Sequence, residues 1–219
     1  IPAFTRTSST LHTLVSEGGV SAVHNARKFG IGNASSDYHD VIQSREIDTL
    51  VIATRHNQHA AQVLMGLDAG KHIFCEKPLC TNLSELQDIR LASVKKPELL
   101  LMVGFNRRFA PHIVKIKELL RTNLEPIVVN ITINAGQIPI SHWTQNPEIG
   151  GGRLIGEACH FIDLCRYIVA SPIVSHSVVK ASKDGLARRD AGDTFILTLK
   201  FEDGSIGSIN YLANGDKSF

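Results

Sequence analysis

The sequence has few of the residues that stabilise secreted proteins and no segment typical of membrane proteins. It has 4 cysteines in 219 residues, and none of them forms a C-x-x-C pair. A disulfide framework needs a higher density of cysteines, so we expect free, mostly buried thiols in a reducing, cytoplasmic compartment. The longest apolar runs, such as ELLLMVGF, are too short to cross a bilayer, so no membrane partner is expected.

An excess of charge of one sign is also absent. The chain has 23 basic and 21 acidic residues, which gives a net charge of +2, and the basic residues are scattered. Nucleic-acid surfaces need clustered positive charge, so no nucleic-acid partner is expected. With 43% apolar and 20% charged residues, the composition is typical of one large or two small globular domains.

The first two-thirds of the chain alternates strand-like and helix-like segments. Residues 47–54 are apolar and β-branched, as expected of a strand buried on both faces. Helix boundaries are indicated by Asp37 as an N-cap, by Gly30 and Gly70 as stops, and by Pro111 in a first turn. Strands are expected at 11–16, 47–54, 71–75 and 98–105, and helices at 20–30, 37–44, 57–70, 82–96 and 110–123. This βαβα order predicts an α/β fold for residues 1–124, with a Rossmann-like, doubly wound parallel sheet.

A G-x-G-x-x-G turn, which normally follows the first strand of such a sheet and binds phosphate, is absent. The first strand is central in the usual order, so a sheet without it has unpaired edges. We therefore expect a dinucleotide-binding domain that is incomplete at its N-terminus, or else a fold that begins at Leu11 with another strand order. The last residues, NGDKSF, suggest that the second domain is incomplete at its C-terminus as well.

The pattern changes after Pro126, and residues 125–219 are expected to form an α+β domain for substrate binding and oligomerisation. Residues 127–136 alternate like an antiparallel strand, and the loop IGGGR leads into a helix over 154–169. Further strands are expected at 173–182, 193–201 and 204–212, with EDGS as a hairpin turn. The second domain should therefore contain an open, mainly antiparallel sheet.

Four short blocks follow one another along the chain: ATRHNQHA, AGKHIFCEKPLC, GFNRRFAPH and GGGRLIGEACHFID. In order and spacing they resemble the glucose-fructose oxidoreductase, inositol dehydrogenase and rhizopine-catabolism (Gfo/Idh/MocA) family, from about Leu11 to Tyr211. The nearest likeness is to the C-terminal module of two-part dehydrogenases, in which a zinc-type alcohol dehydrogenase segment comes first. The resemblance implies an NAD- or NADP-dependent dehydrogenase that transfers a hydride at a ring carbon of a sugar, cyclitol or nucleotide sugar. It also implies a homo-oligomer formed through the C-terminal sheet.

The resemblance further implies the catalytic residues. Lys77 of the EKP triplet would lie between the nicotinamide and the substrate hydroxyl, where an ammonium stabilises a developing alkoxide. His160 would accept the hydroxyl proton, and Glu157 and Asp163 lie three residues to either side on the same expected helix face. Many members have the pattern D-x-G-x-H, whereas this chain has Gly156 in place of the acid. Glu157 is therefore the candidate substitute.

Loops at the expected carboxyl ends of the strands contain the cofactor-binding candidates, because ligands of such sheets bind there. These are Glu17, Thr54, Arg55, His56, Asn57, His59, Glu76, Lys77, Pro78 and Asn106. Glu17 favours NAD over NADP, because a carboxylate accepts from a ribose hydroxyl. The family often has a cis peptide before Pro78.

The substrate-binding candidates are Arg107, Arg108, Trp143 and Arg153. Of the two adjacent arginines, one is expected to bind a substrate anion and the other to form a structural ion pair.

Three alternatives stay open at this point. His56 and His59 are three residues apart, as zinc ligands can be, but no third ligand has suitable spacing, so no metal is expected. Gly156 and the missing glycine-rich turn fit a non-catalytic scaffold module that binds a sugar or nucleotide. A flavodoxin-like domain is the third, although it leaves the GGGR block and His160 without a role.

Overall fold

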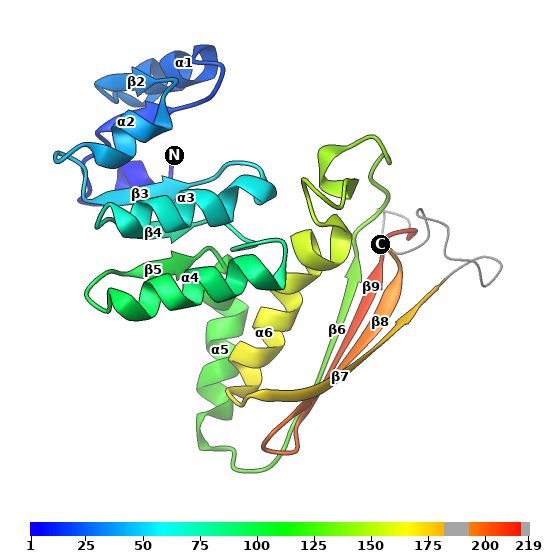
Figure 1. Cartoon of the computed structure of the whole chain (residues 1–219). Helices are drawn as coiled ribbons and strands as arrows, with labels where there is room; N and C mark the ends of the chain where they lie inside the picture. The colour runs from blue at the N-terminus through cyan, green and yellow to red at the C-terminus, as the bar shows by residue number, and fades with distance from the viewer. Residues whose placement is uncertain (182–192, 216–219) are drawn as a thin grey trace. The chain divides into compact units, whose positions relative to one another are not determined.

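The computed structural model describes residues 1–181 and 193–215, which divide into two compact units. Unit 1 comprises residues 1–52, 61–75 and 87–102. Unit 2 comprises residues 53–60, 76–86 and the chain from Val103 onward (Figure 1). The loops that follow two of the strands of unit 1 thus belong to unit 2. The boundary at residues 124 and 125 stays a prediction.

Unit 1 contains the strand–helix alternation that the sequence predicts. Its elements are η1 (Phe4–Arg6), β1 (Thr13–Val15), α1 (Val20–Phe29), β2 (Asn33–Ser35), α2 (Tyr38–Gln43), β3 (Thr49–Ile52), β4 (His72–Cys75), β5 (Leu101–Val103) and most of α3 (His56–Asp68) and α4 (Leu83–Lys95). The expected boundaries are confirmed: the Asp37 side chain accepts from the His39 N–H, and Gly30 ends α1 at a φ of 67°. No helix in residues 1–181 and 193–215 is long and apolar enough to span a bilayer.

The strands of unit 1 form two separate sheets. β1 pairs in parallel with β2, while β3, β4 and β5 form a second sheet in that order, with β3 parallel to β4. Among the described residues, β1 and β3 each have one unpaired edge. Unpaired edges are what the sequence analysis predicts for a sheet without the usual central first strand.

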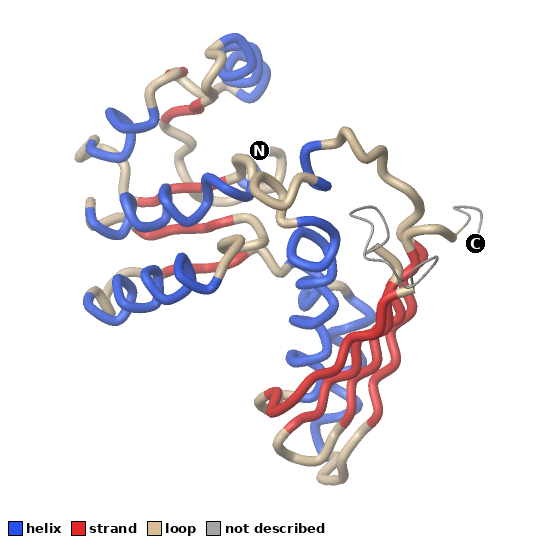
Figure 2. Tube along the Cα trace, turned by 45° about the vertical axis from the view of Figure 1, so that its right-hand side comes forward, coloured by secondary structure: helices blue, strands red, loops and turns tan. Residues whose placement is uncertain are grey.

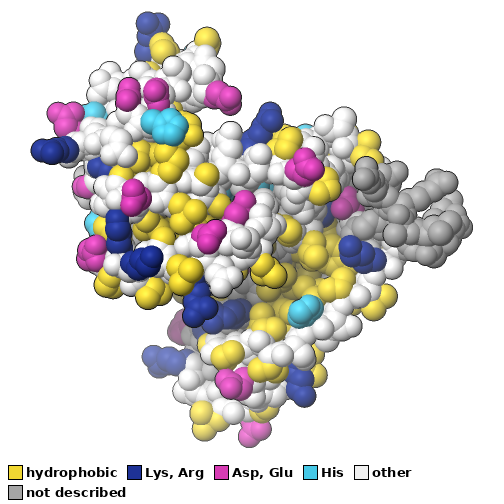
Figure 3. Space-filling view, viewed as in Figure 1, with side chains coloured by type: hydrophobic (Ala, Val, Ile, Leu, Met, Phe, Trp, Pro, Cys, Tyr) yellow, Lys and Arg dark blue, Asp and Glu magenta, His cyan; other side chains and the backbone are white. Residues whose placement is uncertain are grey.

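β3 is buried on one face only, so the prediction that residues 47–54 are buried on both faces is wrong. Leu50 and Ile52 are buried beside α3, where a Cβ on Gly66 would come within 2.8 Å of the Leu50 side chain. Val51, on the opposite face, is 46% exposed. Within unit 1, α3 covers one face of the strand, while on the other face η1 packs Phe4 against Phe74, the β4 partner of Val51. Figure 3 shows hydrophobic side chains among the charged ones on the visible surface of this unit.

Unit 2 is built on a four-stranded sheet in the order β6-β9-β8-β7. Its elements are η2 (Asn106–Phe109), α5 (Pro111–Leu119), η3 (Leu120–Thr122), β6 (Val128–Asn134), η4 (Trp143–Gln145), η5 (Leu154–Ala158), α6 (Cys159–Val169), β7 (Ile173–Lys180), β8 (Phe195–Phe201) and β9 (Ile206–Leu212). The expected hairpin turn is confirmed, with Gly204 at a φ of 89°. The expected strand over residues 173–182 ends at Lys180, and position 182 lies outside the described residues.

The prediction of an antiparallel strand at residues 127–136 is wrong. β6 pairs in parallel with β9, whereas β7–β8 and β8–β9 are antiparallel as expected. Alternation of polar and apolar residues shows that one face of a strand is buried, and either direction of pairing satisfies that pattern. The direction of β6 depends on the long connection through α6. The alternating pattern of polar and apolar residues carries no information about that connection.

α6 packs on one face of this sheet, and no described helix covers the opposite face (Figures 1 and 2). The core between helix and sheet contains Ala158, Phe161, Cys165, Phe195, Leu197, Leu199, Phe201, Ile209, Tyr211 and Ala213. Close approach of α6 requires Gly207, because a Cβ there would lie 3.3 Å from the Cys165 sulfur. The core fixes α6, and with α6 the helical turn before it.

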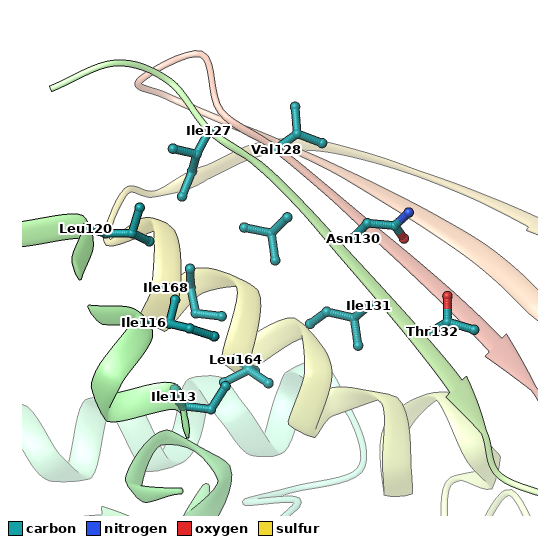
Figure 4. A pocket seen from close by; sticks show the side chains of 11 residues that line it. Ile113, Ile116, Leu120, Ile127, Val128, Asn130, Ile131, Thr132, Leu164 and Ile168 are labelled. Atoms are coloured by element: carbon teal, nitrogen blue, oxygen red, sulfur yellow. The ribbon is translucent and has the colours of Figure 1, made fainter. Parts of the chain in front are cut away.

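An apolar groove of 790 Å³ lies between α5, α6 and β6 (Figure 4). It is lined by Ile113, Ile116, Leu120, Ile127, Val128, Val129, Asn130, Ile131, Thr132, Leu164 and Ile168. None of the predicted site residues lines it. The polar site that the sequence predicts is therefore a different part of unit 2.

The two faces of β8 predict a contrast in stability. Leu199 is buried in the core, so Leu199→Ala should lower the free energy of unfolding by about 2–5 kcal/mol through lost contacts and a cavity. Thr198→Ala, on the exposed face of the same strand, should change it by less than about 0.5 kcal/mol. Urea denaturation measures both values. Equal losses for the two variants would contradict packing of α6 on one face only.

Candidate active site

Lys77 is the centre of a polar cluster in unit 2. Its Nζ donates to the Gly156 carbonyl oxygen at 2.7 Å and to Glu157 Oε1 at 3.2 Å. The Lys77 side chain is 15% exposed and that of Glu157 is 38% exposed. An ammonium has three N–H donors, so one donor remains for another acceptor. The Lys77–Pro78 peptide is cis, as the family resemblance implies.

His59 joins the loops that follow β3 and β4. It is fully buried, with Nδ1 2.7 Å from the Pro78 carbonyl oxygen and Nε2 3.0 Å from that of Thr54. Both ring nitrogens thus face backbone oxygens. Among the residues that the structure describes, no three His, Cys, Asp or Glu side chains are grouped as metal ligands. His59 therefore positions the Lys77 loop, and the cluster offers no zinc site.

His56 attaches the start of α3 to the glycine-rich loop before η5. Its Nδ1 lies 2.8 Å from the Gly150 carbonyl oxygen, and the next N–H, of Asn57, donates to Ile149 at 3.0 Å. Burial lowers the pKa of His56, with Lys77 adding to the effect and the Gly150 carbonyl opposing it. A neutral imidazole has one N–H group, and in this geometry the Nδ1–H of His56 donates to the Gly150 carbonyl oxygen.

Trp143 packs against this histidine. The two rings meet edge to face at 4.8 Å, and the Arg55 guanidinium lies 6.0 Å from the indole. The predicted substrate-binding tryptophan thus has a packing role in the structure.

Gly156 is the position at which many family members have an acid. A Cβ there would lie 3.1 Å from the Gly150 carbonyl oxygen and 3.1 Å from His56 Cε1. The imidazole of His56 and the Gly150 carbonyl thus occupy the space that a side chain at residue 156 would need. A side chain at residue 156 would thus be tightly packed, and His56 or the Gly150 carbonyl would have to shift by a few tenths of an ångström.

The predicted continuous helix over residues 154–169 is wrong in its first turn. Leu154–Ala158 form a π-helical turn, η5, and α6 begins at Cys159. A π turn contains more residues than an α turn, so the spacing of Glu157 from His160 is not that of an α-helix. His160 and Asp163 both lie on α6, three residues apart. Glu157 pairs with Lys77, whereas Asp163 pairs with Arg108 through two hydrogen bonds.

His160 carries an unused nitrogen. The residue is 8% exposed, and its Nδ1 is buried without a hydrogen-bond partner. Burial, together with the positive charges of Lys77 and Arg107, lowers the pKa of His160 from 6.5 to about 4. The unfolded chain therefore binds more protons between about pH 4 and 6.5, and this histidine makes stability rise with pH in that window. At neutral pH the ring is uncharged and can accept a proton.

The adjacent arginines have different surroundings. Arg108 takes the Asp163 carboxylate and lies 5.4 Å from the Tyr167 ring. Arg107 is exposed and stacks 4.5 Å over the Phe161 ring, and no carboxylate of the described chain pairs with it. Of the two arginines, Arg108 thus forms the structural ion pair, and the binding of a substrate anion by Arg107 stays a prediction.

The remaining candidates are dispersed. Glu17 is exposed in unit 1 after β1, Asn106 is exposed at the start of η2, and Glu76 is exposed directly before Lys77. Arg153 is 5% exposed and donates to the Gly136 carbonyl oxygen, with its guanidinium 5.5 Å from the Tyr211 ring. Sequence reasoning missed Tyr211, although the alternation of β9 places it on the buried face of the strand.

Both halves of the chain match models of one protein family. Residues 2–105 match the oxidoreductase family, NAD-binding Rossmann fold, and residues 117–218 match its C-terminal alpha/beta domain. The chain belongs to the Gfo/Idh/MocA oxidoreductase family. The predicted fold class, a Rossmann-like domain followed by an α+β domain, is thereby confirmed.

Relatives within the Gfo/Idh/MocA family include named dehydrogenases. An uncharacterized oxidoreductase, YrbE, of Bacillus subtilis (strain 168) is 33% identical over 180 residues, 80% of this chain and 52% of the relative. The myo-inositol 2-dehydrogenase of Thermotoga maritima is 30% identical over 190 residues, 84% of this chain and 55% of the relative. A solved levoglucosan dehydrogenase, in complex with NADH and levoglucosan, has a TM-score of 0.84 at 27% sequence identity. The match covers 95% of this chain and 59% of the levoglucosan dehydrogenase chain. The chain thus spans little more than half the length of these relatives.

The packing of Gly156 against His56 predicts a coupling between the two positions. Gly156→Asp should lower the free energy of unfolding by about 1–3 kcal/mol through overpacking. Removing the imidazole by His56→Ala should make the same change at residue 156 cost less, and a double-mutant cycle measures the difference. Gly32→Asp is the control, since a Cβ there meets nothing within 4 Å. Additive losses at residues 56 and 156 would contradict the shared space.

Proposed function

We propose that this chain is the catalytic part of an NAD(P)-dependent dehydrogenase. The reaction is hydride transfer between a nicotinamide cofactor and a hydroxyl-bearing carbon of a sugar, cyclitol or nucleotide sugar. Membership of the family supports the reaction class, and the named inositol and levoglucosan dehydrogenases support the substrate class.

One observation carries the proposal. Lys77 keeps one N–H donor beyond its two acceptors, and three residues along the chain from its partner Glu157 the Nδ1 of His160 is buried without a partner. Buried polar atoms normally have hydrogen bonds, and exceptions gather at functional sites. A spare donor and a spare basic nitrogen in one cluster are the two groups that oxidation of an alcohol requires.

The residues present fit a nicotinamide at this cluster. The remaining Lys77 donor lies in the loop after β4, at the carboxyl end of a strand, where dinucleotides bind in such folds. The orphaned Nδ1 of His160, on α6, lies near enough for the Lys77 charge to lower the pKa of that histidine. When bound, the nicotinamide supplies the hydride acceptor. The residues of unit 2 that would hold it are Thr54, Arg55, His56, Asn57, His59, Glu76, Lys77, Pro78 and Asn106.

The side chains divide the remaining work. Lys77 donates to the substrate oxygen and stabilises the charge that develops on it. Glu157 holds the ammonium in place, in a chain that has glycine at position 156. His160, neutral because its pKa is near 4, accepts the hydroxyl proton. Arg108 and Asp163 fix the loop after β5 to α6.

A second candidate is a non-catalytic scaffold that binds a sugar or nucleotide. The observation that favours it is Gly156, which replaces the usual acid at a position where a Cβ would lie only 3.1 Å from two neighbouring atoms. Titration of NADH with the protein separates the two candidate functions. A scaffold that no longer binds the cofactor leaves the fluorescence of NADH unchanged.

The open sheet of unit 2 supports the expectation of a homo-oligomer. Its uncovered face presents Val128, Ile196 and Ile206, which are 75%, 49% and 42% exposed. A second copy of the chain on this face would bury them. A cytoplasmic location stays a prediction from the free cysteines.

The proposal predicts the effect of removing the ammonium. Lys77→Met should lower kcat/KM for NAD⁺-dependent oxidation of an accepted sugar by about 10²- to 10³-fold, because the developing alkoxide loses its donor. NADH absorbance gives the rate and circular dichroism checks the fold. Lys115→Met, which breaks an exposed pair on α5, is the control. A Lys77→Met protein that turns over at the unaltered rate would refute the assignment.

A further inference from the structure

Arg153 is a buried cation without a carboxylate partner. The residue is 5% exposed, and its Nε is buried with no hydrogen-bond partner. Its one hydrogen-bond acceptor is the Gly136 carbonyl oxygen, and no ion pair to Arg153 occurs within residues 1–181 and 193–215. A buried charge is costly unless it is paired, so this guanidinium is suited to an anion that comes from outside the described chain.

The location of Arg153 relates it to the catalytic cluster. Residue 153 precedes η5, and Glu157, the partner of Lys77, follows it by about one helical turn. The charges of Arg153, Arg107 and Glu157 all act on the Tyr211 hydroxyl, so these side chains surround one tyrosine. A ligand held at Lys77 is therefore near enough to Arg153 for an anionic substituent to be attracted to it.

The surrounding side chains orient this guanidinium. Arg153 lies 5.5 Å from the Tyr211 ring, and burial raises the pKa of Tyr211 to about 12, with Arg153 and Arg107 opposing the rise. Tyr211 packs 6.4 Å from Phe161, over which Arg107 is stacked. Two guanidinium groups thus rest on two neighbouring rings of the same core.

The charges around the cluster are unbalanced. Glu157 forms an ion pair with Lys77, and Asp163 forms an ion pair with Arg108. Asp193 lies near Tyr211, but its carboxylate accepts from Gln145 at 2.8 Å and makes no ion pair with Arg153. Arg107 and Arg153 are left without a carboxylate in the described part of the chain. A neutral sugar would leave the buried charge of Arg153 uncompensated, whereas the exposed Arg107 is solvated.

We infer that the substrate carries an anionic group, a carboxylate or a phosphate, which binds the Arg153 guanidinium with Arg107 as second cation. The substrate class is then a sugar acid or a sugar phosphate, and neutral sugars are poor ligands. Charge-assisted hydrogen bonds from a planar guanidinium suit both groups. This inference rests on the proposed function, which places the reacting carbon of the substrate at Lys77 and His160.

Binding tests the inference without turnover. Isothermal titration of the intact chain, with and without NAD⁺, would use D-glucuronate, D-glucose 6-phosphate and D-glucose as probes. We expect at least one anionic probe to bind about tenfold or more tightly than glucose, and the better of the two identifies carboxylate or phosphate. Equal affinity for all three, or tighter binding of glucose, would overturn the inference. Because no reaction is needed, this outcome is independent of whether the chain is a dehydrogenase.

Variants locate the anion. Arg153→Met and Arg107→Gln should each reduce the anionic-over-neutral affinity ratio by about fivefold or more, whereas Arg121→Gln, an exposed arginine of η3, should not. Arg107 is exposed, so its variant keeps the test valid if Arg153→Met does not fold. A ratio unchanged in both site variants would assign Arg153 a purely structural role. If no probe reduces NAD⁺ while the preference for anions persists, the proposed reaction fails and the anion site stands.

Discussion

The contact of Lys77 with Gly156 and Glu157 is the constraint on which the candidate site depends. A largely buried ammonium needs acceptors, and here both come from the π turn that precedes α6. The loop after β4 and the start of the helix are thereby held together. α6 is fixed in turn by its packing on the sheet through Phe161 and Cys165. The core of unit 2 thus determines where the lysine can lie.

Two histidines maintain this arrangement by packing and hydrogen bonding. His59 connects the loops after β3 and β4, and His56 connects the start of α3 to the glycine-rich loop. His56 also packs closely against Gly156, so packing disfavours a side chain at the position where many family members have an acid. Glu157, one position further along the chain, thus places a carboxylate beside the Lys77 ammonium.

Much of the fold was predictable because its signals are local. Asp37 and Gly30 mark helix ends through their own backbone preferences, and apolar periodicity located the strands. What depends on distant contacts was not predictable: the parallel pairing of β6, the exposed face of Val51 and the π turn at Leu154. In the site, the motifs identified Lys77 and His160, but no pattern shows that Arg108 takes Asp163 and leaves Arg107 unpaired.

The most direct test of the central claim is the pKa of His160, measured by NMR titration of its imidazole. If Lys77 and His160 belong to one site, the native pKa is near 4, and Lys77→Met raises it because a nearby positive charge is lost. Lys115→Met, on α5, leaves it unchanged. A His160 pKa near 6.5, or one that is insensitive to residue 77, would show that the two nitrogens do not share a site.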